Sequence, residues 1–163
     1  MTETSFPGES PQKVQNALAA AGIPTTVREM PASTRTAKEA AATIGCTVAQ
    51  IAKSLVFRAS VTDRAILVIA SGINRVNEAL LAQFVGEPIE RATPEFVRER
   101  TGFVIGGVPP IGHPSALPTW MDRDLLQFET IWAAAGTPFA VFEISPADLQ
   151  RISGATVSDL KSK

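Results

Sequence analysis

The sequence is poor in the residues that carry metal and redox chemistry. It contains one cysteine, Cys46, one histidine, His113, and no tyrosine. A single cysteine excludes an intramolecular disulfide, and no group of cysteines and histidines has the spacing of a zinc site. We therefore expect no metal and no cofactor, and we interpret Cys46 as a small buried hydrophobic residue.

An excess of either charge and a long apolar run are also missing. The 15 lysines and arginines and 16 aspartates and glutamates leave a net charge of −1 at pH 7. No overall basic field therefore indicates a polyanionic partner, although a local basic patch stays possible. No apolar stretch approaches the ~20 residues of a membrane span. Because the first residues, MTETSFPGESPQ, lack the basic and apolar parts of a signal peptide, we expect a cytoplasmic protein without a membrane partner.

The common catalytic motifs are absent. The sequence has no G-x-x-x-x-G-K-[ST] phosphate loop, no G-x-S-x-G nucleophile elbow and no H-E-x-x-H zinc motif. A serine–histidine–aspartate triad would have to use His113, which lies between Gly112 and Pro114 in a loop. Since no serine is marked as its nucleophile, the sequence disfavours a triad hydrolase.

The chain of 163 residues, 45% of them hydrophobic, suits one compact domain, which we place at residues 11–160 after a disordered tail at 1–10. The clearest strands, 54–60 and 65–71, flank a hairpin-like turn, so we expect a mixed or antiparallel sheet rather than a doubly wound one. The tail at 157–163 is polar. Further strands are predicted at 24–30, 87–93, 117–122, 128–134 and 138–144, and helices at 11–22, 36–45, 48–52, 76–86, 93–102 and 145–154.

Lys53 is the first candidate for chemistry. It stands in QIAKSLVF, at the entrance to an apolar strand. Such a lysine can extend along the apolar surface and place its ammonium in solvent. If it points into a cleft instead, the ammonium can bind a phosphate or polarise a carbonyl.

The second candidate is the stretch TGFVIGGVPPIGHPSALPTWMD at 101–122, with four glycines and four prolines. Its three central glycines permit a close approach of backbone to a ligand, and Pro109 and Pro110 restrict the freedom of the loop. We interpret 103–105 as the end of a strand that leads into a rigid backbone cradle at 106–112. The alternative is a tight turn between two strands.

Three motifs carry a resemblance to a known family. The motifs are A-A-x-x-I-G-C-x-x-x-x-I-A-K-S-L-V-F, then T-G-F-V-I-G-G-V-P-P-I-G-H, then L-P-T-W-M-D. In this order and spacing they resemble the YbaK/EbsC family across residues 12–155. These are free-standing trans-editing domains related to the insertion domain of bacterial prolyl-tRNA synthetase. The resemblance implies an α+β fold with a mixed, partly barrel-like β-sheet and flanking helices. It also implies metal-independent hydrolysis of the ester between a mischarged amino acid and the 3′ end of a tRNA.

The resemblance also implies site residues. Lys53 would be the essential lysine, and the loop from Gly106 to Gly112 would embrace the aminoacyl ester. We assign Gly106, Gly107, Pro110 and Gly112 to the catalytic loop, and His113, Val27, Arg28 and Asp122 to substrate binding, although His113 could equally have no role. The partners implied are aminoacyl-tRNA, which Arg28, Arg35 and Arg75 could contact through its phosphates, and, as a candidate, an aminoacyl-tRNA synthetase.

Two departures from the family concern specificity. Members that clear cysteine carry a tyrosine near the position of Val27 and an aspartate near that of Val141. Their absence argues against cysteine on tRNA(Pro) and favours another small amino acid, such as alanine, serine or threonine, on tRNA(Pro) or a related tRNA. Two alternatives stay open, namely a non-catalytic binding module for aminoacyl-tRNA or a synthetase, and a hydrolase of small esters or aminoacyl adenylates.

Overall fold

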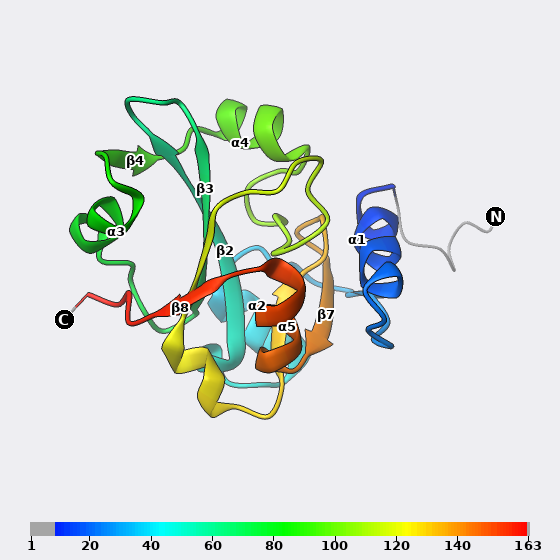
Figure 1. Cartoon of the computed structure of the whole chain (residues 1–163). Helices are drawn as coiled ribbons and strands as arrows, with labels where there is room; N and C mark the ends of the chain where they lie inside the picture. Colours follow the sequence, from blue (N-terminus) through cyan, green and yellow to red (C-terminus); the bar gives the residue numbers. More distant parts are fainter. Residues whose placement is uncertain (1–8, 163) are drawn as a thin grey trace.

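One eight-stranded mixed β-sheet organises residues 9–162, which are those that the computed structural model describes (Figure 1). Its strands follow the spatial order β1-β7-β6-β2-β3-β5-β8, and β4 pairs with β2 beside this path. The mixed sheet and its flanking helices confirm the predicted fold class. The strands are β1 Arg28–Glu29, β2 Ile51–Ala59, β3 Ala65–Ser71, β4 Ile89–Arg91, β5 Thr119–Asp122, β6 Ile131–Ala134, β7 Ala140–Ile144 and β8 Thr156–Ser158.

The central strand β2 pairs with one strand, β3, along one edge and with two different strands, β6 and β4, along the other. Along the first edge it runs antiparallel to β3 from Ala52 to Arg58. On the second edge, β6 pairs in parallel with Ile51 and Ala52, and β4 pairs antiparallel with 57–59. Residues 53–56 therefore have no strand partner on this edge within the described chain, apart from a hydrogen bond that Ala92 N donates to the Val56 carbonyl at 3.3 Å. The sheet is split at this point.

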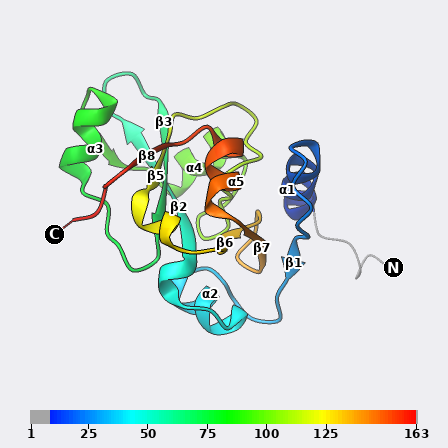
Figure 2. The same cartoon turned by 60° about the horizontal axis from the view of Figure 1, so that its bottom comes forward.

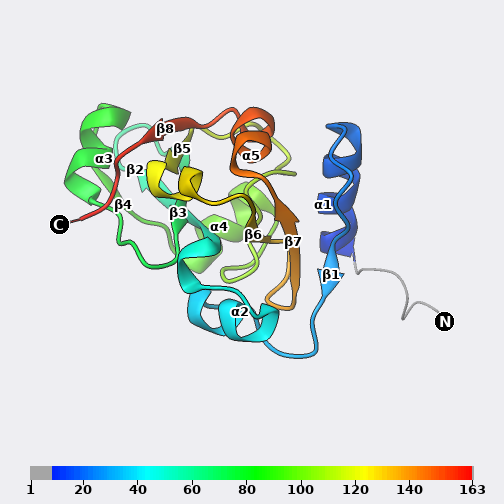
Figure 3. The same ribbon diagram turned by 90° about the horizontal axis from the view of Figure 1, so that it is seen from below.

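Five α-helices cover the two faces of the sheet. The main core packs α1, α4 and α5 against one face, and α2 and α3 cover the other face in two smaller apolar clusters. Helices α1 and α3 lie at opposite ends of the molecule in all three views (Figures 1, 2 and 3). The helices are α1 Glu9–Ala20, α2 Ala37–Ile44, α3 Glu78–Val85, α4 Pro94–Thr101 and α5 Pro146–Ser153.

The helices begin and end where capping residues allow it. The Thr36 hydroxyl accepts a hydrogen bond from the backbone of Glu39, whose side chain bonds back to the Thr36 backbone, and α2 ends at Gly45 with a φ of 90°. The Thr93 hydroxyl caps α4 by accepting a hydrogen bond from Phe96 N–H, with a proline in the first turn. Because these caps satisfy the free N–H and C=O groups of helix ends, they fix boundaries that the sequence predicts well.

Several predicted elements are wrong or incomplete. The helix expected at 48–52 is a 3₁₀ turn, Val48–Gln50, after which β2 begins at Ile51, because residues 51 and 52 pair with β6. The strand expected at 24–30 is only Arg28–Glu29. Residues 103–105 form no strand. A second 3₁₀ turn, Arg123–Gln127, lies where no element was expected.

The two ends of the chain also differ from expectation. Glu9 and Ser10 belong to α1 rather than to the tail expected at 1–10, and residues 1–8 of that tail lie outside the described residues. At the other end, the polar segment after 155 contains β8, which pairs with β5, and Leu160 is only 1% exposed. Pairing with a sheet edge, which local sequence does not reveal, makes this segment part of the fold.

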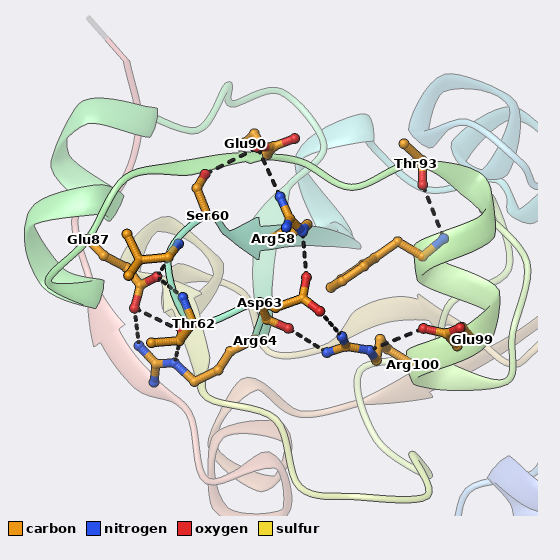
Figure 4. Close-up of polar contacts among 12 residues, drawn as sticks. Arg58, Ser60, Thr62, Asp63, Arg64, Glu87, Glu90, Thr93, Glu99 and Arg100 are labelled. Atoms are coloured by element: carbon orange, nitrogen blue, oxygen red, sulfur yellow. Dashed lines mark hydrogen bonds and ion pairs between the residues drawn. The ribbon is translucent and has the colours of Figure 1, made fainter.

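The hairpin between β2 and β3 is held by an acidic side chain from a distant part of the sequence (Figure 4). One carboxylate oxygen of Glu87 accepts hydrogen bonds from the backbone N–H groups of Val61 and Thr62, both at 2.9 Å. The other accepts from the Thr62 hydroxyl at 2.9 Å and from Arg64 at 3.2 Å. These donors, with the Thr62 backbone N–H the strongest, lower the pKa of Glu87 to about 2.

The depressed pKa predicts a pH-dependent contribution to stability. Since the folded pKa of Glu87 lies below the ordinary value of 4.5, its contribution is complete above pH 4.5 and is lost as the pH falls from there toward 2. We expect Glu87→Gln to lower the melting temperature at pH 7, and the difference from the unchanged protein to shrink below pH 4.5. Thermal unfolding between pH 2.5 and 7 measures this. Glu99→Gln, at a side chain 75% exposed, serves as control, and a constant difference across the range would contradict the prediction.

Candidate functional site

Two adjoining cavities lie where the sheet is split. The larger has a volume of about 470 Å³ and the smaller about 160 Å³. The larger is bordered by the start of β2, the N-terminal end of α2, β6 and Val141 of β7, and the smaller continues along β2 toward β4. The residues that line both cavities, and so form their junction, are Ser54, Leu55, Ile105, Gly106 and Val108.

Lys53 lines the larger cavity as a half-buried cation. Its neighbours on the same face of β2 are Ile51, which packs with α2, and Leu55, which packs with α3. It forms no ion pair with any residue in the range 9–162. Burial, followed by repulsion from Arg91 and Arg75, lowers the pKa of Lys53, and attraction to Asp122 opposes this only in part. An ammonium that the fold does not neutralise is thus held at the cavity wall, where it can bind an anion or a developing oxyanion.

The first half of the glycine–proline loop forms part of the cavity wall. Gly106, with a φ of 92°, packs so closely on Arg35 that a Cβ would lie 2.5 Å from the Arg35 Cγ. A Cβ on Gly107 would lie 2.6 Å from backbone atoms of Thr137. Gly107 N–H donates to the Val104 carbonyl at 3.0 Å, and Gly136 N–H donates to the Gly107 carbonyl at 2.9 Å. The backbone groups of Gly107 therefore hold the loop in place and are not free for a ligand.

The second half of the loop faces α1 instead of the cavities. Pro110 is buried, and a Cβ on Gly112 would lie 3.8 Å from Ala17 of α1. His113 Nε2–H donates to the Pro109 carbonyl at 2.8 Å, and its ring packs edge-on against Phe103 with centroids 5.7 Å apart. Burial lowers the pKa of His113. None of the three lines either cavity, so their expected contact with substrate stays a prediction.

Among the residues that the sequence assigns to substrate binding, Val27 lies in the main core and lines neither cavity. Arg28 pairs in register with Val141, and its guanidinium lies 5.0 Å from the ring centroid of Trp132. Because Val141 and Trp132 both line the larger cavity, Arg28 borders that cavity through them. Arg35 lines it directly.

Asp122 lies behind the cavity wall. It is 1% exposed, and its carboxylate accepts hydrogen bonds from Ser71 N–H at 3.1 Å, the Asn74 side-chain amide at 2.8 Å and Asp124 N–H at 2.9 Å. These bonds fix the turn after β3 that contains Gly72, a lining residue of the larger cavity. In this structure Asp122 positions the wall and does not itself line the cavity.

Sequence reasoning missed three residues at the site. Gly72 packs so tightly that a Cβ would lie 2.4 Å from the Val48 carbonyl oxygen. The Ser54 hydroxyl is buried at the junction of the cavities with no hydrogen-bond partner in the described part of the chain. Arg91 lines the smaller cavity. The position of Ser54 directly after Lys53 was a usable signal, whereas nothing local marks Arg91.

Within residues 9–162 no group of three or more histidine, cysteine, aspartate or glutamate side chains is placed to hold a metal ion. In the same range no helix has the length and apolar character to cross a membrane.

The sequence model of the aminoacyl-tRNA editing domain matches residues 31–152, which include both Lys53 and the glycine–proline loop. The chain belongs to this family. A relative is similar over most of the chain: YwhH of Bacillus subtilis (strain 168), an uncharacterized protein, is 34% identical over 131 residues, or 80% of this chain and 83% of YwhH. The predicted family is thus confirmed.

Two solved structures have the same fold as this chain. A crystal structure of a proposed trans-editing enzyme for prolyl tRNA synthetase superposes with a TM-score of 0.91 at 48% identity, covering 97% of this chain and 100% of that one. A structure from the computational grafting of epitopes onto scaffold proteins gives a TM-score of 0.89 at 42% identity, covering 96% and 99% of the two chains. The YbaK-like architecture expected from the motifs is therefore the observed one.

Close packing at Gly107 predicts a local effect of adding a single methyl group. Gly107→Ala places a Cβ against the Thr137 backbone and should destabilise the fold by ~1–3 kcal/mol while shifting the amide resonances of Ser54 and Lys53. Gly112→Ala, where φ is 87° but the nearest atom is 3.8 Å away, should cost about 1–2 kcal/mol through backbone strain and leave those resonances in place. Denaturant unfolding and ¹H–¹⁵N spectra measure both variants. Unchanged cavity resonances in Gly107→Ala would show that the loop does not shape the wall.

The environment of Lys53 predicts an unusual titration. Because burial and two arginines lower the pKa of Lys53, while hydrogen bonding to Asp124 raises the pKa of Lys161, we expect Lys53 to lose its proton at a lower pH than Lys161. Carbon NMR of the lysine Cε atoms across pH 7–12 gives both values. Arg91→Ala should raise the pKa of Lys53, and identical titrations of the two lysines would contradict the assignment.

Proposed function

We propose that the protein is a trans-editing aminoacyl-tRNA deacylase that removes a small mischarged amino acid from the 3′ end of tRNA(Pro) or a related tRNA. The observation that carries the proposal is the unneutralised cation of Lys53 in a cavity at the split of the sheet. Membership in the editing-domain family supports this activity. The likeness to a proposed trans-editing enzyme for prolyl tRNA synthetase supports the choice of tRNA and makes an aminoacyl-tRNA synthetase a candidate partner.

The chemistry needs few protein groups because an aminoacyl ester is already activated. A water, positioned by the cavity or by the neighbouring ribose hydroxyl, attacks the ester carbonyl carbon. The carbonyl electrons move to its oxygen, whose charge the Lys53 ammonium stabilises. The bond from carbon to the ribose oxygen then breaks, and that oxygen takes the proton that the attacking water gives up. The products are the free amino acid and a tRNA with an unesterified end.

The lining of the larger cavity supports a small, uncharged amino acid. Its wall beside Val141 is formed by alanines and by Ile44, Ile51 and Trp132. None of the lining residues is acidic, so a basic side chain would find no counter-charge there. Val141 also lies near the position where the cysteine-clearing members carry an aspartate. We therefore propose alanine, serine or threonine as the amino acid that is removed.

Single-turnover deacylation of a panel of mischarged tRNAs tests the proposal. At least one tRNA carrying alanine, serine or threonine should be deacylated faster than in buffer alone. Lys53→Ala should slow that reaction by ~10²–10³-fold, as expected for the loss of an oxyanion-stabilising donor. Lys161→Ala, which removes a lysine paired with Asp124 at 3.0 Å, is the matched control and should have no effect.

Each contrary outcome has a distinct meaning. Equal rates for Lys53→Ala and the unchanged protein would refute the role of Lys53. Tight tRNA binding without turnover across the whole panel would favour a binding module over an enzyme. Equal activity on a minimal aminoacyl ester and on the tRNA would favour a hydrolase of small esters.

A further inference from the structure

Two cations lie on the face of the sheet that α2 and α3 cover. Lys53 and Phe57 lie on that face of β2, and Arg91 of β4 pairs with Phe57, so its side chain lies on the same face. The Arg91 guanidinium is 6.0 Å from the Phe57 ring centroid. Arg75 follows β3, and its charge and that of Arg91 both lower the pKa of Lys53. The three side chains therefore act electrostatically on one region.

Arg91 is the cation of this group that borders a cavity beyond Lys53. It lines the smaller cavity, which joins the larger one at Ser54 and Gly106. Its one ion pair within residues 9–162 joins Nε to Glu78 at 3.4 Å, and the side chains are 66% and 44% exposed. Exposed pairs of this kind contribute little. The terminal nitrogens of Arg91 have no acceptor among the described residues and can bind an anion in a fork.

The junction between the two cavities presents an apolar side chain on this face. Leu55 lines both cavities and lies between Lys53 and Phe57 on the same face of β2. Ser54 points to the opposite face, and its hydroxyl is buried without a partner in the described chain. A ligand that runs from Lys53 to Arg91 would therefore pass over Leu55, which can pack against the carbon atoms of a ribose.

We propose that Arg91 binds the phosphate of the terminal nucleotide, with the ester at Lys53, the ribose beside Leu55 and the phosphate in the smaller cavity. This assignment rests on the proposed function and adds the direction in which the nucleotide lies. The distance between the two cations fits such a ligand. Lys53 and Phe57, which pairs with Arg91, are four positions and roughly 13 Å apart along β2. Two long side chains can therefore reach the two ends of a ligand that spans one ribose. Arginine suits this position since its guanidinium matches phosphate geometry.

A binding experiment tests the phosphate site without relying on turnover. Titrations of 5′-AMP and of adenosine, followed by ¹H–¹⁵N spectra, should show about tenfold tighter binding of 5′-AMP to the unchanged protein. Arg91→Ala should remove that preference, because a hydrogen-bonded charge contact is worth about this factor. Arg151→Ala, at a side chain 59% exposed and paired with Asp148 on α5, should retain it. Equal preference in Arg91→Ala and the unchanged protein, or no preference in either, would overturn the proposal.

A second variant separates phosphate binding from a structural role of Arg91. Glu78→Gln removes the ion-pair partner of Arg91 and leaves the guanidinium in place, so the preference for 5′-AMP should persist. If Glu78→Gln and Arg91→Ala lose it equally, Arg91 acts through the fold and the proposal is wrong.

Kinetics distinguish failure of this inference from failure of the proposed function. With the amino acid esterified to the ribose of 5′-AMP or of adenosine, Arg91→Ala should lower kcat/KM about tenfold for the first ester and leave the second unchanged. On the tRNA, the same variant should reduce the slope of log affinity against log salt by about 0.7. If Arg91→Ala lowers kcat/KM equally for both esters, the assignment of Arg91 to the phosphate is wrong and the proposed deacylase activity is unaffected. No hydrolysis of the esters on the tRNA panel by the unchanged protein would refute the deacylase, while the 5′-AMP titration would still decide on Arg91.

Discussion

The shared edge of β2 is the constraint on which the site depends. A strand inside a sheet normally satisfies its backbone groups on both sides, and β2 does so with β3 along its length. On the other edge β6 leaves after Ala52 and β4 arrives only at Phe57. The four residues between them cannot be covered by a strand, so side chains and a loop surround the opening. Lys53 and Ser54 lie there for that reason.

The glycine–proline loop is two structures in succession. Up to Val108 it closes the opening in the sheet, and the absence of a Cβ at 106 and 107 allows it to approach Arg35 and Thr137 closely. From Pro109 to His113 it packs toward α1, with the His113–Pro109 hydrogen bond holding it. The second part anchors the first. The motif predicts one continuous cradle, but only its first part forms the cavity wall, and its second part supports that wall.

Local signals made much of this fold predictable. Caps at Thr36 and Thr93, the αL glycine at 45 and the apolar β2–β3 hairpin gave helices and strands near their observed positions. The failures lie where a distant partner decides, as with residues 51–52, which join β6, and β8, which joins β5. For the site, Lys53 and Gly106 were predictable because their chemistry is unusual in their context. Arg91 and Gly72 were not, since only tertiary pairing brings them to the cavities.

Net charge is a poor guide to the partners of this chain. The total charge of −1 does not show how the charges are distributed over the molecule. The carboxylate of Glu87 accepts hydrogen bonds from the turn at 61–64, and that of Asp122 accepts them from the turn after β3. Among residues 9–162, the lining charges around the cavities are Arg35, Lys53 and Arg91, with no lining carboxylate. A field that is nearly neutral at a distance is therefore positive where a phosphorylated substrate would enter. Such a surface admits the end of a polyanion while offering little attraction to the rest, which suits a protein that must release its tRNA once the ester is cleaved.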